Sequence, residues 1–371
     1  MVTRIGYAFS EGSFEQLCLG FAYPASIIAS GVVGSIFLAR VNKTRFFYVW
    51  LFLGVSTAIC LAIPMGSSLY ATLTLTVMLG VSIGVGAPIC LSYFKESVSI
   101  ENRGKVGGII LFATIFGSIF ILTIMSTLDL TSSATLLAMW RLWSLPMLFF
   151  VSENKVQPSL STEKTPPLIS VLRNRTFFLY FVAWLMFALV DSLETVVLNV
   201  TVEEYRFFVN VEPIFAGFSA LIAGLFSDLI GRKRVLIFGF ISLGIAYATI
   251  GLLPQIWISW LFYFIIDGIA LGLLWVLFVV VLWGDLSRNG SEKFYAIGEI
   301  PFFLTGIFYL LLAPYLALIP ESSAFSLAAF FLFLAVLPLL YAPETLPEKK
   351  IKERELRMYI GEAKKIKEKY A

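Results

Sequence analysis

Long apolar stretches of about 20 residues alternate with short polar segments along almost the whole chain. A helix rises about 1.5 Å per residue and needs about 20 apolar residues to cross about 30 Å of hydrocarbon. The pattern therefore predicts an all-α integral membrane protein with eleven spans. We expect them at roughly residues 17–39, 46–65, 69–94, 106–126, 134–152, 176–199, 209–230, 234–253, 257–284, 294–316 and 323–342.

The composition supports the membrane class. Hydrophobic residues make up 59% of the chain and charged residues 14%, whereas soluble domains have about 45–50% and about 25%. Histidine is absent and the three cysteines lie inside apolar runs, so we expect no metal site, disulfide framework or cofactor. The net charge of +3 gives no support for nucleic-acid binding.

Basic residues gather in alternate loops, which sets the orientation. They are Arg40, Lys43, Arg45, Lys95, Arg103, Lys105, Lys155, Lys164, Arg173, Arg175, Arg232 to Arg234, Arg288 and Lys293. Short cytoplasmic loops carry excess Lys and Arg, so this side and the C-terminus are expected in the cytoplasm. The basic tail 348–371 has an apolar helical stripe, which fits either an amphipathic helix on the inner leaflet or a solvated charged segment.

The chain contains an internal repeat with an offset of 189 residues. Residues 35–45 align with 224–234, Gly80 and Gly84 fall within a residue of Gly268 and Gly272, and Glu96 aligns with Asp285. Two similarly oriented copies are the design of transporters whose site lies at the repeat interface. We expect an N-terminal bundle over 1–152, a cytoplasmic loop over 153–175, a C-terminal bundle over 176–342 and a tail over 343–371.

The repeat also predicts a helix before the first predicted span. A unit repeated in one orientation holds an even number of spans, and the helix at 176–199 has its partner at about −13 to 10. We therefore expect the genomic sequence upstream of Met1 to encode, in frame, about 20 further apolar residues. A stop codon immediately upstream would instead favour eleven spans and an external N-terminus.

One cytoplasmic corner carries a distinctive motif, Gly224-x-x-x-Asp228-x-x-Gly231-Arg232-Lys233-Arg234. It resembles the signature loop of the major facilitator superfamily of secondary transporters. The resemblance implies that Asp228 faces the N-terminus of a neighbouring helix, that Gly231 permits a tight turn, and that Arg232 and Lys233 anchor the corner. An ordinary positive-inside loop is the alternative, but it would not require the acid or the glycines.

The first copy of this corner departs from the family pattern. Arg40 and Lys43 are basic as expected, but Ala39 replaces the acid and Asn42 the second glycine. The resemblance therefore implies a weaker latch on that side.

Two further stretches are similar to the same family. Gly80 to Pro88, followed by Glu96 and Arg103, resembles its fourth helix and the loop after it; the glycines suit close helix packing, and the charges suit a cytoplasmic network. Pro343-Glu344-Thr345 resembles the motif that closes sugar-porter-like members. The fifth helix has glycines but lacks the Gly-Pro motif of drug and proton antiporters.

Charged residues inside the spans are candidates for the transport site, because each is costly at mid-bilayer unless paired or hydrated. Counted from the external helix ends, Arg141 lies at about 10 Å, Asp191 at about 12 Å and Asp267 at about 15 Å depth. Asp191 and Glu194 share one helical face, and Glu212 and Glu299 lie nearer helix ends. We expect Asp267 to pair with Arg141 and Asp191 to carry a proton; a structural ion-pair network is the alternative.

Trp275 lies two turns beyond Asp267 on the same predicted helix, where it could stack on a substrate or pack between helices.

The favoured function is transport of a small solute across the cell membrane by alternating access. We expect this transport to be coupled to H⁺ and the protein to act as a monomer in the lipid bilayer. A non-transporting membrane sensor or an integral membrane enzyme on the same fold is the alternative. An enzyme would need a convergent nucleophile, base or metal set, and the sequence offers none.

Overall fold

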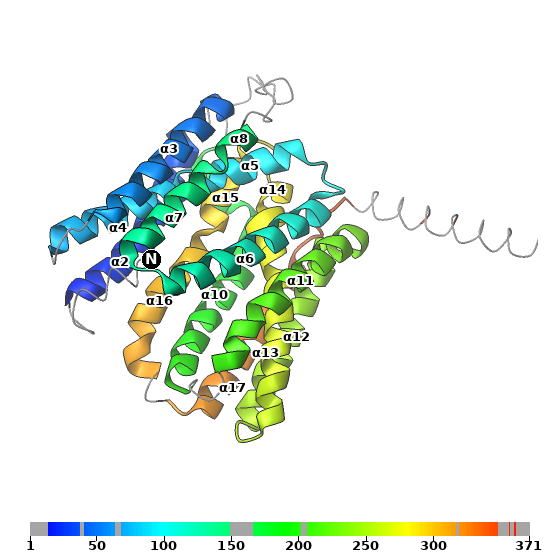
Figure 1. Ribbon diagram of the computed structural model, residues 1–371. Helices are drawn as coiled ribbons and strands as arrows, with labels where there is room; N and C mark the ends of the chain where they lie inside the picture. Colours follow the sequence, from blue (N-terminus) through cyan, green and yellow to red (C-terminus); the bar gives the residue numbers. More distant parts are fainter. Residues whose placement is uncertain are drawn as a thin grey trace, which may run out of the picture.

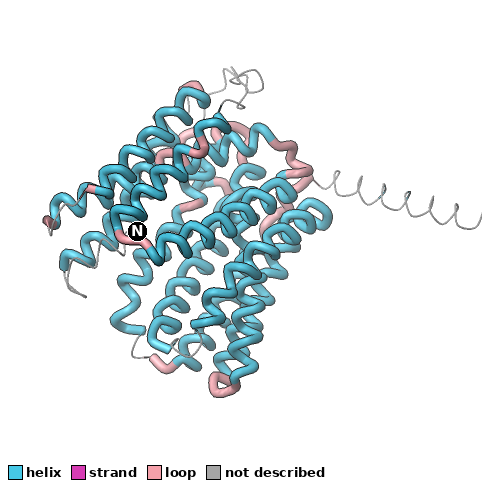
Figure 2. Tube along the Cα trace, in the orientation of Figure 1, coloured by secondary structure: helices cyan, strands magenta, loops and turns pink. Residues whose placement is uncertain are grey.

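The computed structural model describes residues 14–37, 41–63, 68–148, 166–201, 206–316 and 319–347, together with 356 and 360. Arg40, the loop 153–165 and most of the tail lie outside these residues. The described part is helical, without a strand (Figure 2). Its first helices are α2 (Phe14–Phe37), α3 (Lys43–Ala62), α4 (Leu69–Gly84), α5 (Ala87–Ser97), α6 (Arg103–Thr127), α7 (Leu130–Leu142) and α8 (Leu145–Leu148).

The second half begins with the short α9 (Leu168–Arg173) and continues through nine further helical segments. They are α10 (Arg175–Thr201), α11 (Arg206–Ile230), α12 (Arg232–Leu252), α13 (Trp257–Trp275), the π-helix η1 (Val276–Val281), α14 (Leu282–Leu286), α15 (Ser291–Gly298), α16 (Ile300–Leu316) and α17 (Glu321–Tyr341). We refer to α2–α8 as the N-terminal bundle and to α10–α17 as the C-terminal bundle.

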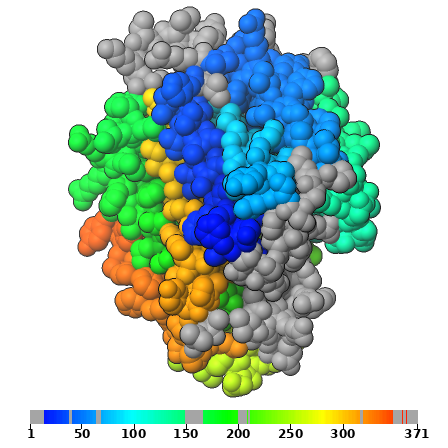
Figure 3. All heavy atoms as spheres, turned by 90° about the vertical axis from the view of Figure 1, so that its left-hand side faces the viewer, coloured from blue at the N-terminus to red at the C-terminus, as the bar shows by residue number. Residues whose placement is uncertain are grey.

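Two pairs of long helices join the bundles. Helix α6 runs beside α11 (Figure 1), and α2 runs beside α16, which Figure 3 shows as neighbouring dark blue and orange surfaces. The shorter α5 and α15 also pack together. We call the contact of α6 with α11 the α6–α11 seam, and the contact of α5 with α15 the α5–α15 seam.

Ten helices in the described part are long and apolar enough to cross a membrane, so the predicted membrane class is correct. The predicted span 134–152 differs from the structure. Helix α7 ends at Leu142, Trp143 and Ser144 form a turn, and α8 follows with four residues before the described residues stop. Pro146 is the second residue of α8, in its first turn, where a proline is tolerated, but it cannot donate to a helix continued from α7.

The predicted span 69–94 is divided near Val85 and Gly86 into α4 and α5. Pro88 has no backbone N–H to offer the preceding turn. Two residues earlier, the Gly86 N–H donates to the Ile83 carbonyl at 3.2 Å and not to Ser82, and the Ser82 carbonyl accepts a hydrogen bond from the Trp50 indole at 2.6 Å. A Cβ on Gly86 would lie 1.9 Å from that indole, so the glycine makes room for the side chain that supports the break.

The repeated glycine pairs bring helix backbones together. In α4, a Cβ on Gly84 would lie 2.2 Å from the Ile27 carbonyl oxygen of α2. In α13, a Cβ on Gly272 would lie 2.2 Å from the Ala216 carbonyl oxygen of α11. The same contact thus occurs in both bundles, as expected for small residues between membrane helices.

We expect Gly272→Ala to destabilise the protein by about 1–3 kcal/mol, because α11 and α13 must move apart to admit the methyl group. Thermal unfolding of the purified protein in detergent measures the effect. Gly117→Ala is the control, since its Cβ would meet only Trp140 atoms at 3.7 and 3.8 Å. Equal melting temperatures for the two variants would contradict close packing at Gly272.

Candidate functional site

Four carboxyl groups gather inside the C-terminal bundle. Asp191 and Glu194 come from α10, Glu212 from α11 and Asp267 from α13, and they interact electrostatically with one another. We call these four residues the acid cluster. The sequence placed Asp191 and Asp267 at a similar depth and Glu194 on the same helical face as Asp191. Glu212 joins them because the start of α11 lies against Gly268 of α13.

Glu194 is held by two tyrosines. Its two carboxylate oxygens accept hydrogen bonds from the hydroxyls of Tyr247 on α12 and Tyr263 on α13. The rings meet edge to face, with centroids 5.3 Å apart. The sequence did not indicate these tyrosines as part of the site, although a buried carboxylate requires hydrogen-bond donors.

Asp267 has no such donors. Its side chain is buried, and neither carboxyl oxygen has a hydrogen-bond partner among the described residues. The Glu212 carboxyl faces Asp267 closely enough for the two groups to interact. A carboxylate can only accept, so a hydrogen bond between these two groups requires that one of them carries a proton.

Arg141 does not join the acid cluster, so the expected pairing with Asp267 is wrong. Both terminal guanidinium nitrogens of Arg141 lie 3.4 Å from the Ser82 hydroxyl, within the N-terminal bundle. Gly54 of α3 provides the space, since a Cβ there would lie 1.8 Å from the guanidinium. Similar depth did not bring the groups together, because helix rotation points Arg141 toward its own bundle.

Trp275 packs between two helices of the C-terminal bundle. Its ring meets Phe302 of α16 edge to face, with centroids 5.9 Å apart. This contact fits the packing alternative for Trp275.

At the basic end of the molecule, Asp228 links the bundles. Its carboxylate accepts hydrogen bonds from the backbone N–H groups of Gly104 at 2.9 Å and Lys105 at 2.7 Å, in the first turn of α6. This geometry, which joins a carboxylate to the positive end of a helix, agrees with the position that the family resemblance implies. Gly224 allows it, because a Cβ there would lie 2.2 Å from the Gly104 carbonyl oxygen.

A buried charge network extends from this contact. Arg232 donates to Asp228 at 2.5 Å and to Asp285 at 3.1 Å, and Arg103 of the other bundle donates to Asp285 at 2.7 Å. The Asp285 and Arg232 side chains are fully buried. Asp285 therefore binds one arginine from each bundle, although its sequence position indicated only that it is the repeat partner of Glu96.

The repeat reproduces one of these pairs in the N-terminal bundle. Lys43 and Glu96, which align with Arg232 and Asp285, form an ion pair at 2.5 Å. This pair is more exposed, with 20% and 37% of the side chains accessible. The expected network of Glu96 with Arg103 is therefore wrong in its partners: Glu96 binds Lys43, and Arg103 binds Asp285.

The Pro343-Glu344-Thr345 motif caps α12. The Glu344 carboxylate accepts from the backbone N–H of Arg232 at 2.9 Å and of Lys233 at 3.1 Å. Gly231, which precedes the helix, has φ 105° and ψ 154°, a conformation open mainly to glycine. The Lys233 ammonium donates to the Leu340 carbonyl at 2.7 Å, so the corner is anchored to the end of α17.

The α5–α15 seam is joined by hydroxyl groups. The Ser92 and Ser291 hydroxyls lie 2.7 Å apart, and the Lys95 ammonium donates to the Arg288 carbonyl at 3.2 Å. Together with the Asp228 and Asp285 contacts, these interactions close the basic end of the molecule between the two bundles.

Two helical bundles with membrane-spanning hydropathy, joined at a buried charged corner of this kind, fit a multi-pass membrane transporter. The family model described as Major Facilitator Superfamily matches residues 176–368, more than half of the chain. The protein belongs to this superfamily and is a transporter of small solutes, not an enzyme.

Three solved structures share the fold. The chain is similar to the proton:xylose symporter XylE bound to 6-bromo-6-deoxy-D-glucose (15% identity, 89% of this chain and 86% of that one, TM-score 0.68). It is similar to the human organic anion transporter MFSD10 (13% identity, 91% of this chain and 88% of that one, TM-score 0.65). It also resembles the transporter FucP in the outward conformation (10% identity, 92% of this chain and 94% of that one, TM-score 0.72). No curated protein matches the chain significantly by sequence.

Proposed function

We propose that this protein moves a small polar solute by alternating access between its two bundles and that H⁺ drives the movement. The observation that carries the proposal is the acid cluster. Four carboxyl groups lie together without a cationic side chain among their described contacts, and Asp267 has no hydrogen-bond donor. Buried like charges are costly, so this cluster favours binding of a proton.

We further propose that the basic end is cytoplasmic, following the positive-inside rule, and that the structure represents a state closed on that side. The bundles meet there through Asp228, Asp285 and the α5–α15 seam. The similarity to FucP, whose structure is in the outward conformation, supports this assignment. Alternating access then requires these contacts to break.

Sugars are the first solutes to test. The Pro343-Glu344-Thr345 motif resembles sugar-porter-like members, and XylE is a proton:xylose symporter. A ligand present at 100 times its dissociation constant stabilises a protein by about 2.7 kcal/mol. We therefore expect a substrate to raise the thermal unfolding temperature in a screen of sugars and other metabolites, and to accumulate in proteoliposomes when the lumen is made alkaline.

The seam gives a direct test of alternating access. In a chain with Cys18, Cys60 and Cys90 replaced by Ser, we expect Ser92→Cys with Ser291→Cys to form a disulfide under mild oxidation, because the two hydroxyl oxygens lie 2.7 Å apart. The cross-link should stop solute uptake, and reduction should restore it. Each single-cysteine variant serves as control. Full uptake by the cross-linked protein would contradict opening at this seam.

A further inference from the structure

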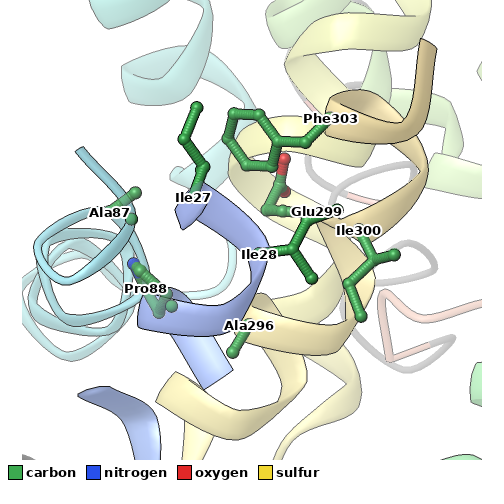
Figure 4. A pocket seen from close by; sticks show the side chains of 10 residues that line it. Ile27, Ile28, Ala87, Pro88, Ala296, Glu299, Ile300 and Phe303 are labelled. Carbon is green, nitrogen blue, oxygen red and sulfur yellow. The ribbon is translucent and has the colours of Figure 1, made fainter. Parts of the chain in front are cut away.

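A second buried carboxyl group lies between the bundles, apart from the acid cluster. A pocket of about 270 Å³, including space open to the outside, is formed by α2, α5 and the α15–α16 region. Its apolar walls include Ile27, Ile28, Pro88, Ile300 and Phe303. Glu299 is the one acidic side chain that lines it (Figure 4).

Glu299 is unsatisfied in this position. The residue is 5% exposed, and its Oε1 atom has no hydrogen-bond partner in the described structure. The Trp283 indole of α14 faces the carboxyl, but its Nε1 atom has no hydrogen-bond partner among the described residues either. A buried charged oxygen without a donor is unfavourable, so burial favours the neutral form of this carboxyl.

The charges near Glu299 do not neutralise it. The pocket residues of α2, α4 and α5 carry no titratable side chain. From α14 only Trp283 faces the carboxyl. On its own helical segment Tyr295 interacts with it electrostatically, but the Tyr295 hydroxyl donates to the Val280 carbonyl at 2.7 Å. Arg103 and Asp285, the next charged groups near Tyr295, are already paired with each other.

The chemistry of the pocket selects the ligand. A calcium or magnesium ion requires about six or more oxygen ligands, and a primary ammonium group has three N–H donors to satisfy. The pocket offers one carboxyl group among apolar side chains. A proton needs no further ligand, and it removes the charge that burial makes costly.

We propose that Glu299 is a proton-binding site at the interface of the two bundles, occupied when they are closed and vacated when they separate. The proposal rests on alternating access as described above. Because the walls come from both bundles, their separation admits water to Glu299, and a hydrated carboxyl can ionise. By linkage, high pH favours the separated state and low pH the closed one.

The test measures opening as a function of pH in the full chain. With the three native cysteines replaced by Ser, Ser291→Cys reports opening, since Ser291 is 2% exposed in the closed seam. Ser97→Cys is the control, because Ser97 is exposed; the ratio of the two maleimide-labelling rates cancels the titration of the thiol. The purified protein is studied in nanodiscs from pH 5 to 9.

We expect the labelling ratio to rise with pH, by up to about tenfold per pH unit above the ionisation midpoint for a single linked proton. Glu299→Gln, which has the shape of the protonated acid, should give a low ratio that is independent of pH. Asp129→Asn should retain the pH dependence, since Asp129 is an exposed carboxyl that caps α7 and lies outside both carboxyl sites.

A ratio in Glu299→Gln that follows pH as in the parent would overturn the proposal, and so would a parent ratio that ignores pH. Neither result would affect the assignment of the acid cluster to solute coupling, which is judged by uptake. If Glu299→Gln does not fold, infrared spectroscopy of the parent is decisive. A protonated-carboxyl band must disappear in step with the rise in labelling, and a band that stays constant over this range contradicts a proton site.

Discussion

Asp285→Asn is expected to open the basic end of the transporter. The variant leaves Arg103 without a carboxylate partner, while Arg232 keeps only Asp228. Removing one partner from a buried ion pair costs about 3–5 kcal/mol, and most of this cost falls on the closed state, where the Asp285 side chain is fully buried. Maleimide labelling of Ser291→Cys should therefore accelerate strongly.

The internal repeat provides a matched control for this variant. Glu96→Gln removes the aligned acid and the same charge, but its partner Lys43 lies in the same bundle and the pair is partly exposed. Surface pairs contribute about 0–1 kcal/mol, so labelling should change little. Equal effects of the two substitutions would show that Asp285 does not hold the bundles together.

Asp267→Asn is expected to abolish accumulation of solute driven by a pH gradient while leaving exchange of solute across the membrane intact. Asparagine keeps the size of the side chain but cannot take up and release a proton. Once a substrate is known, both activities can be measured in proteoliposomes with the same preparation. Asp129→Asn serves as control, because Asp129 is an exposed residue that caps α7 through Thr131 and Ser132.

The structure favours Asp267 over Asp191 as the group that carries the coupled proton. The sequence favoured Asp191 because Arg141 was expected to neutralise Asp267, but Arg141 binds Ser82 instead. If Asp191→Asn abolishes gradient-driven accumulation and Asp267→Asn does not, the coupling group is Asp191. If uptake by the unmodified protein ignores the gradient, the acid cluster has a structural role.

The membrane spans could be predicted because polar groups are costly in hydrocarbon, so each span must be composed of apolar residues. The breaks within the spans were harder to predict. Gly86 and Pro88 are visible in the sequence, but the decisive partner is Trp50 on another helix. Hydropathy measures how apolar a segment is, but it does not indicate which distant side chain will donate a hydrogen bond to a carbonyl left without its helical partner.

The corner motif was predictable for a related reason. The contact of Asp228 with the first turn of α6 depends on a short pattern of acid and glycines that the family resemblance identifies. Asp285 was harder to recognise, because its two arginines lie 182 and 53 residues away. Arg141 shows the limit of arguments from depth, since two groups at one level can still face different helices.

The first copy of the repeat carries Ala39 where the second carries Asp228, and in the described residues different groups join the two seams. On the α6–α11 side, Asp228 accepts from two backbone N–H groups and the buried Arg103 binds Asp285. On the α5–α15 side, the Ser92 hydroxyl contacts Ser291 at 2.7 Å and Glu292 at 3.5 Å, and Lys95 donates to the Arg288 carbonyl. Charge-assisted hydrogen bonds are about twice as strong as neutral ones. We therefore expect the bundles to separate asymmetrically. The α5–α15 contacts should break first, while α6 and α11 stay together and act as the hinge.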